Sequence, residues 1–302
     1  MARLPIVHHP DYDARFSPVH RFPMGKYTLL MNALRERGIV ERASLHRPGP
    51  APSNWLGLAH ERGYVDRVLT QRVPRSIERL IGFAVDERVA RRASLACAGT
   101  VLAARLALEE GLACNTAGGS HHARFEHGAG FCVFNDVAVA AQVLRAGGEV
   151  RRILIVDADV HQGDGTARIF ANQPDVFSFS IHGARNYPST KERSDLDIEL
   201  ADGTGDDAYL QRLAVGLGDA LARFPDPDLA FYLAGIDPHH EDRLGRLSLT
   251  DEGLARRDEM VLKALRERSI PTACVISGGY SRDMESLGRR HAIVFGVAET
   301  LI

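Results

Sequence analysis

The sequence predicts an α/β protein in which an open parallel sheet is covered by helices on both faces. Three short apolar runs, typical of buried parallel strands, each end in polar residues. Segments with the apolar spacing of amphipathic helices separate these runs. Strands that alternate with helices form parallel sheets, which bind ligands beyond the carboxyl ends of the strands. The predicted strands are 151–159, 227–237 and 270–280.

The helices are predicted from apolar periodicity and from the residues that begin or end a helix. One long pattern ends at Gly111, and another has Asn135 or Asp136 as its N-cap and stops at Gly147. The Pro-rich stretch 46–54 is short and predicts a loop, so residues 1–302 are expected to form a single domain. The helical segments are 86–111, 134–148, 206–224 and 250–268.

The composition is that of an ordinary globular protein. The 302 residues are 45% hydrophobic and 25% charged with a net charge of −2, which argues against a nucleic-acid or anionic-membrane surface. Four cysteines without a CxxC pair are expected to be buried free thiols in a reducing compartment. The N-terminus lacks a signal-peptide core, and no apolar run approaches the ~20 residues that span a bilayer. We expect a cytoplasmic protein, and its oligomeric state stays open.

The segment "VDADVHQGDG" contains the sharpest signal of chemistry. Asp157, Asp159 and His161 are spaced two residues apart, so their side chains point to one side while the chain stays extended. Two carboxylates and an imidazole disfavour one another unless a cation lies among them. Such mixed ligands favour Zn²⁺, and Fe²⁺ and Mn²⁺ also accept them. Taken alone, the pattern also fits a capped strand end with surface acids.

Asp237 strengthens the metal hypothesis because it follows a second buried run, "LAFYLAGI". A mononuclear catalytic zinc takes three protein ligands and keeps one position open for water. Asp159, His161 and Asp237 would supply that set. Four other histidines are expected to be loop or surface residues: His8, His9, His239 and His240.

His121 and His122 lie in the glycine-rich stretch "TAGGSHHARFEHGAGFCVFND". Adjacent residues face different sides of a regular helix or strand, but glycines let the backbone bend until both rings converge. A metal that activates water needs a general base and a general acid, and histidine suits both roles near neutral pH. Asp157 and Asp164 are the natural carboxylates to orient the two rings. Tyr280, on its own Gly-rich turn, can donate to a developing oxyanion.

Five segments in a fixed order together resemble the histone deacetylase superfamily, whose members have the arginase/deacetylase fold. The resemblance runs from roughly residue 20 to the C-terminus, and the combination is highly specific. "HRFPMGKY" at 20–27 and Gln162 after the metal histidine look closest to the class IV branch and its bacterial relatives. The segments are "GGSHHARFEHGAGFCVFNDVAVA", "IVDADVHQGDGTARIF", "FSIHGARNYP", "YLAGIDPHHEDRLGRLSLT" and "ISGGYSRD".

The resemblance implies two bound metals. The family's zinc ligands match Asp159, His161 and Asp237. The family also holds a structural potassium ion near the same strand, partly through backbone oxygens. Its ligands match Asp157, Asp159, His161, Ser180 and Ile181.

The resemblance also assigns catalytic roles. It pairs His121 with Asp157 and His122 with Asp164. His122 would be the principal general base and then the general acid, and His121 would act mainly through its charge. Tyr280 would polarise the scissile carbonyl together with zinc.

The substrate-binding residues implied by the family form a narrow slot for an alkyl chain. A glycine next to the slot lets its wall approach the substrate, and a glycine pair precedes Tyr280. The implied set is Gly130, Phe131, Tyr187, Leu244, Gly278 and Gly279.

The resulting hypothesis is zinc-dependent hydrolysis of an N-acyl amide. The preferred substrate is Nε-acyl-lysine in a protein or peptide, with an acetyl or a longer fatty-acyl group. The first alternative is a deacetylase of small amides such as acetylpolyamines. A binuclear manganese ureohydrolase would need further acids, whereas position 163 is Gly. A dead acyl-lysine reader would have no need for the complete catalytic set.

Overall fold

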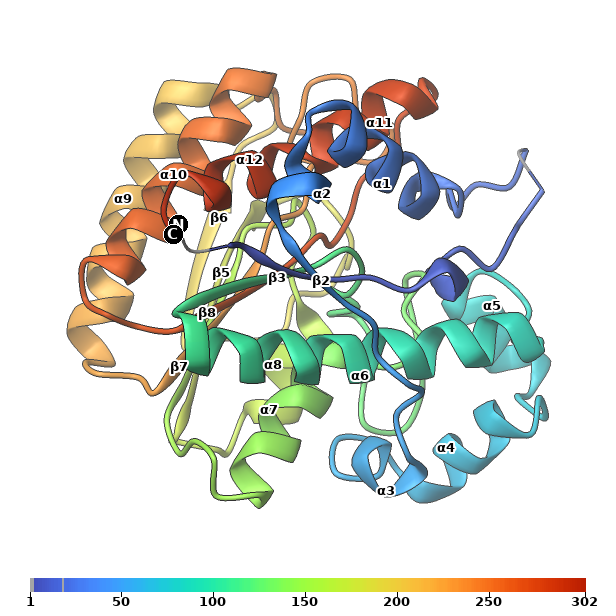
Figure 1. The fold of residues 1–302 in the computed structure, drawn as a ribbon. Coiled ribbons are helices and arrows are strands. Elements are labelled where there is room, and N and C mark those ends of the chain that lie inside the picture. Colours follow the sequence, from blue (N-terminus) through green and yellow to red (C-terminus); the bar gives the residue numbers. More distant parts are fainter. Residues whose placement is uncertain (1–2, 18) are drawn as a thin grey trace.

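The computed structural model describes residues 3–17 and 19–302, which form one eight-stranded sheet between two layers of helices (Figure 1). Every pair of neighbouring strands is parallel. The strand order is β2-β1-β3-β8-β7-β4-β5-β6. The strands are β1 (Pro5–Val7), β2 (Ser44–His46), β3 (Leu112–Asn115), β4 (Ile153–Asp157), β5 (Val176–Gly183), β6 (Leu196–Leu200), β7 (Leu229–Leu233) and β8 (Thr272–Val275).

The strands β3, β8, β7 and β4 lie side by side at the centre of the sheet, and all their residues are buried. Three of them, β4, β7 and β8, are the strands that the sequence predicts. Asp157 is level with Leu233, and Leu233 is level with Val275. The carboxyl ends of these strands therefore open onto one edge, where parallel sheets bind their ligands.

Helices lie on both faces of the sheet, as predicted: α6 and α7 on one side, and α9, α10 and α12 on the other (Figure 1). In the described part of the chain, no helix combines the length and apolarity needed to cross a membrane. The α-helices are α1 (Lys26–Glu36), α2 (Ile39–Arg42), α3 (Ser53–Leu56), α4 (Arg62–Leu69), α5 (Arg75–Ile81), α6 (Glu87–Glu110), α7 (Asp136–Ala146), α8 (Asp164–Phe170), α9 (Asp206–Arg223), α10 (Asp251–Arg266), α11 (Met284–His291) and α12 (Ile293–Glu299), and a 3₁₀ helix spans Pro10–Tyr12.

The four predicted helices are confirmed as α6, α7, α9 and α10, each within two residues at either end. The end of α6 at Gly111 is also confirmed, with a left-handed φ of 85°. The N-cap of α7 is Asn135, whose side-chain oxygen accepts the backbone N–H of Ala138 at 3.0 Å. The four cysteines are free and buried, as expected.

Asp136 has a different role from the capping that the sequence left open for it. Its buried carboxylate accepts hydrogen bonds from the Thr100 hydroxyl at 2.6 Å and from the backbone N–H groups of Gly119 and Ser120 at 3.2 and 2.8 Å. Burial raises the pKa of this carboxyl above its usual value. Asp136 therefore holds the loop that leads directly into His121.

The strand β5 escaped prediction because its sequence alternates apolar residues with Ser178, Ser180 and His182. Such alternation is typical of a strand with one solvated face, yet all eight residues are buried. The strands β1 and β2 have three residues each, too few for a periodic signal.

A buried ionic network on α10 connects the loops that follow β4 and β7. Arg257 is fully buried and donates to the backbone carbonyls of Ala158 and Gly235. It also donates to the carboxylate of Asp258, at 2.8 and 2.9 Å. Tyr232 donates to the same carboxylate at 2.6 Å. One guanidinium thus fixes both loops relative to the helix behind them.

The substitution Arg257→Met is expected to lower the free energy of unfolding by about 3–5 kcal/mol, because it leaves the Asp258 carboxylate buried without its partner. Urea denaturation measures this loss. Arg256→Met is the matched control: its exposed pair with Asp207 is worth less than about 1 kcal/mol. Equal losses in the two variants would contradict the assigned role of Arg257.

Candidate active site

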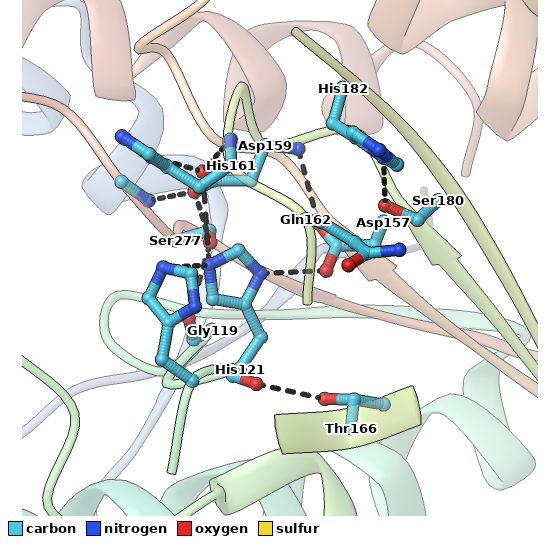
Figure 2. A network of polar contacts seen from close by, with 12 residues as sticks. Gly119, His121, Asp157, Asp159, His161, Gln162, Thr166, Ser180, His182 and Ser277 are labelled. Atoms are coloured by element: carbon cyan, nitrogen blue, oxygen red, sulfur yellow. Dashed lines mark hydrogen bonds and ion pairs between the residues drawn. The ribbon is translucent and has the colours of Figure 1, made fainter. Parts of the chain in front are cut away.

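Four loops at the carboxyl edge of the sheet converge on one point. The histidine pair follows β3, the Asp159–His161 segment follows β4, Asp237 follows β7, and Tyr280 follows β8. Because these strands are neighbours, residues distant in sequence meet, and Ser277 donates to Asp159 across 118 positions (Figure 2).

The candidate metal site consists of Asp159, His161 and Asp237, which are all buried. One donor atom from each lies within 4.8 Å of the others. His161 Nδ1 is 3.0 Å from Asp159 Oδ1 and 3.1 Å from Asp237 Oδ2. The Ser277 hydroxyl and the backbone N–H of Gly278 each donate to Asp159 Oδ2 at 2.7 Å. The predicted ligands are therefore brought together and held in place.

The convergence of the two carboxylates requires glycine at position 278. A Cβ there would lie 2.0 Å from Asp237 Oδ2 and 2.6 Å from Asp159 Oδ2, closer than a Cβ atom approaches such neighbours in real proteins. On the other side, the backbone N–H of Val160 donates to Asp237 Oδ1 at 2.9 Å. Both carboxylates are thus positioned by backbone groups of neighbouring loops.

The charges of this cluster fit a divalent cation. Burial and the Asp159 carboxylate raise the pKa of Asp237 to about 7. Burial opposes the charged form of His161, but hydrogen bonds to Asp159 and Asp237 outweigh it and raise its pKa to about 10. In the protein alone, a proton on the His161 ring therefore offsets the charge of only one of the two carboxylates. A cation with two oxygen ligands and one nitrogen ligand can replace that proton, and this donor set suits zinc.

Each histidine of the pair has its own carboxylate. His121 Nδ1 is 2.7 Å from Asp157 Oδ2, and His122 Nδ1 is 2.6 Å from Asp164 Oδ1. The two Nε2 atoms lie 3.2 Å apart and next to the metal cluster, with His121 Nε2 3.8 Å from Asp159. The structure therefore contains both pairings that the family resemblance implies.

The two rings have opposite electrostatic environments. Burial opposes protonation of His121, but Asp157 and Asp159 outweigh it and raise its pKa to about 9. Burial and the neighbouring His121 lower the pKa of His122 to about 4, against the effect of Asp164. One ring is thus charged and the other is neutral, which matches a division between an electrostatic role and a general base.

Arg124 is a residue that the sequence reasoning missed. Its guanidinium donates to Asp164 Oδ2 at 2.8 Å, while the other oxygen of Asp164 contacts His122. Glu192 lies 3.6 Å from the same guanidinium. Arg124 stands two positions after His122, so its place in the motif was the only available signal.

The predicted potassium ligands lie beside the hydrogen-bonded pair of His121 and Asp157. Ser180 on β5 is level with Asp157 on β4, and its hydroxyl is 2.9 Å from His182 Nδ1 (Figure 2). The backbone N–H of Asp159 donates to Asp157 Oδ1 at 3.1 Å. Ile181 also lies on β5, and His161 lies in the loop that follows β4. Potassium binding at this place stays a prediction.

A cavity of about 380 Å³ reaches from solvent to His122, His161 and Tyr280. Gly130 has a φ of +53°, and a Cβ there would lie 2.6 Å from His122 Cδ2, so only glycine lets the wall approach the ring. The Tyr187 ring packs edge-on against His122, with ring centroids 4.8 Å apart. The cavity wall includes four predicted substrate-binding residues, Gly130, Phe131, Tyr187 and Leu244.

A deeper cavity of about 20 Å³ adjoins the metal cluster and is lined by Gly278 and Tyr280. Its lining also includes two cations to which the sequence reasoning gave no role, Lys26 and Arg92. Lys26 is buried and donates to the carbonyl of Ser277 at 2.9 Å, and burial and Arg92 lower its pKa to about 8. Gly279 lines neither cavity, since it packs against Ile236 and His291.

The four histidines that the sequence assigns to loops or to the surface are not part of the metal cluster. His239 is buried, with Nε2 3.2 Å from Asp251, and His240 accompanies it in the same loop. His9 accepts the backbone N–H of Asp11 at 3.0 Å, and His8 contacts Thr116 at 2.8 Å. As expected, these residues lie in loops, although His9 and His239 are not at the surface.

Comparison with known proteins gives a consistent family. A histone deacetylase domain model matches residues 20–296. An uncharacterized protein of Picosynechococcus sp. is 47% identical over 294 residues, covering 97% of this chain and 98% of the relative. A probable deacetylase of Archaeoglobus fulgidus is 32% identical, covering 91% of this chain and 81% of the relative. An acetylpolyamine amidohydrolase of Burkholderia pseudomallei is also 32% identical, covering 68% and 62%.

The crystal structure of the HDA15 HD domain superposes with a TM-score of 0.80, covering 97% of this chain and 88% of that chain at 23% identity. At this level of identity the likeness shows a shared fold, and it confirms the predicted arginase/deacetylase fold. The family model adds a match across most of the sequence. The chain therefore belongs to the histone deacetylase family of hydrolases.

Proposed function

We propose that this protein is a zinc-dependent deacylase that hydrolyses the amide of Nε-acyl-lysine. The main support is the position of the Asp159–His161–Asp237 cluster at a cavity that opens to solvent. The two His–Asp pairs and Tyr280 lie beside this cluster. The cavity wall includes Phe131, Tyr187 and Leu244, whose side chains can pack against the alkyl stem of a lysine.

The chain's own groups can perform the remaining steps of amide hydrolysis. A zinc ion held by the cluster would supply a Lewis acid for the attacking water and the scissile carbonyl. His122 accepts the proton of the water at Nε2 and returns it to the departing amine, while Asp164 holds Nδ1 of the same ring. His121 provides positive charge beside the reacting carbonyl. The Tyr280 hydroxyl donates to the carbonyl oxygen as negative charge develops on it.

The deeper cavity limits the size of the acyl group. Its volume of about 20 Å³ has room for little more than one water molecule. It is also lined by Lys26 and Arg92, whose charges make an unfavourable environment for an alkyl tail. We infer that the enzyme acts on acetyl or similarly small acyl groups rather than on fatty-acyl groups.

A series of lysine peptides with acyl chains from acetyl to myristoyl tests both the zinc-dependent hydrolysis and the limit on acyl size. We expect the highest kcat/KM for acetyl, a fall with chain length, and loss of activity after treatment with a metal chelator. A kcat/KM that rises towards myristoyl would refute the size limit. Turnover of acetylpolyamine without turnover of any peptide would instead support the small-amine alternative.

The substitution Asp237→Ala should abolish metal binding, because a zinc site with only two protein ligands is incomplete. Elemental analysis of the purified protein should find zinc at about one per chain in the wild type and almost none in the variant. Asp207→Ala removes a carboxylate from an exposed side chain and should retain zinc. Full zinc retention in Asp237→Ala would remove Asp237 from the ligand set.

The substitution Tyr280→Phe should reduce kcat by about 10²-fold or more, because it removes one donor to the developing oxyanion. Zinc content should not change, since the hydroxyl is not part of the metal cluster. Steady-state kinetics on an acetyl-lysine peptide measure the loss. An unchanged kcat would reject the oxyanion role of Tyr280.

A further inference from the structure

We propose that the mouth of the active-site cavity selects substrates that have carboxylate groups next to the scissile acyl amide. This inference rests on the proposed function, since it concerns the same cavity. The residues that select such substrates are arginines that lie outside the reacting centre.

Four arginines line the cavity between solvent and the metal cluster, and all four are exposed. Among the described residues, no Asp or Glu lines the same cavity. The arginines come from four separate parts of the chain: the N-terminal segment, α5, the loop beyond β5 and the loop beyond β7. They are Arg21, Arg79, Arg185 and Arg246.

The positive charge at the mouth is only partly neutralised. Arg185 and Arg246 share a single carboxylate, Asp202, at 3.8 and 3.1 Å. Arg21 and Arg79 have no ion-pair partner within 4.0 Å in the described ranges 3–17 and 19–302. The mouth of the cavity therefore has a surplus of positive charge.

The nearby acids are engaged elsewhere. Glu241 pairs with Arg290. Asp242 accepts the backbone N–H groups of Leu244 and Tyr280, at 2.8 and 2.7 Å. Neither carboxylate is available as an acidic gate for a cationic substrate.

Charges of one sign at the entrance of a cleft attract ligands of the opposite sign and repel those of the same sign. An acetylpolyamine would bring further ammonium groups to this mouth and meet repulsion. A substrate with carboxylates beside the acyl-lysine would meet attraction. Two sources provide that chemistry: acidic residues that flank the lysine in a polypeptide, and the α-carboxylate of free Nε-acetyl-lysine.

The test compares three peptides with one central acetyl-lysine, flanked by Asp, by Ala or by Lys, together with free Nε-acetyl-lysine and acetylspermidine. On the wild-type enzyme, we expect kcat/KM to fall on the order of tenfold from Asp to Ala flanks and again to Lys flanks. The differences should shrink in high salt, because salt screens exposed charges. The higher kcat/KM of the Asp-flanked peptide or of free acetyl-lysine then identifies the source of the carboxylates.

The double variant Arg21→Glu with Arg79→Glu should reverse the order of the Asp-flanked and Lys-flanked peptides. Arg212→Glu is the control, since Arg212 is exposed on α9 and does not line the cavity. It should keep the wild-type order.

Equal kcat/KM for the three peptides, or an unchanged order in the double variant, would overturn the inference while the proposed hydrolysis stands. Loss of turnover on every substrate would instead overturn the proposed function. In that case, fluorescence anisotropy of labelled Asp-flanked and Lys-flanked peptides decides the charge preference by binding alone. Tighter binding of the Asp-flanked peptide supports the inference, and equal binding overturns it.

Discussion

Negative charge buried at the carboxyl edge of the sheet is the constraint around which this molecule is arranged. A carboxylate removed from water must be paired, protonated or bound to a cation. Two buried acids, Asp157 and Asp164, each have a histidine partner, and those two rings are the ones that proton transfer requires. Asp159 and Asp237 share His161 and leave a surplus of negative charge that a divalent cation can balance. The same contacts therefore stabilise the fold and prepare the site. The four acids are Asp157, Asp159, Asp164 and Asp237.

Much of this edge was predictable because its residues directly follow apolar strands. Asp159 and Asp237 were found in this way, since the register of β4 and β7 brings both strand ends to one level. The helices α6 and α7 were also predictable, from their capping residues and from the spacing of their apolar residues. The pairing of each histidine with its carboxylate came from family resemblance, because spacing alone does not decide which acid faces which ring.

The residues that escaped prediction act through contacts between distant parts of the chain. Arg257 is 99 positions from Ala158, and on α10 it looks like one more charged residue on a helix face. Lys26 reaches Ser277 across 251 positions. No periodicity marks a buried cation, because only the folded chain shows which charged side chains lose their contact with water. The same limit applies to the mouth, whose four arginines come from distant parts of the chain and share no motif.

The peptide groups that support the two ligand carboxylates connect ion binding to local order. The backbone N–H of Gly278 donates to Asp159, and that of Val160 donates to Asp237. Without a cation, repulsion between these acids works against both hydrogen bonds at once. Amide hydrogen exchange at the two positions should therefore slow together when an ion binds. Exchange at these two backbone amides would thus report whether the cluster holds an ion.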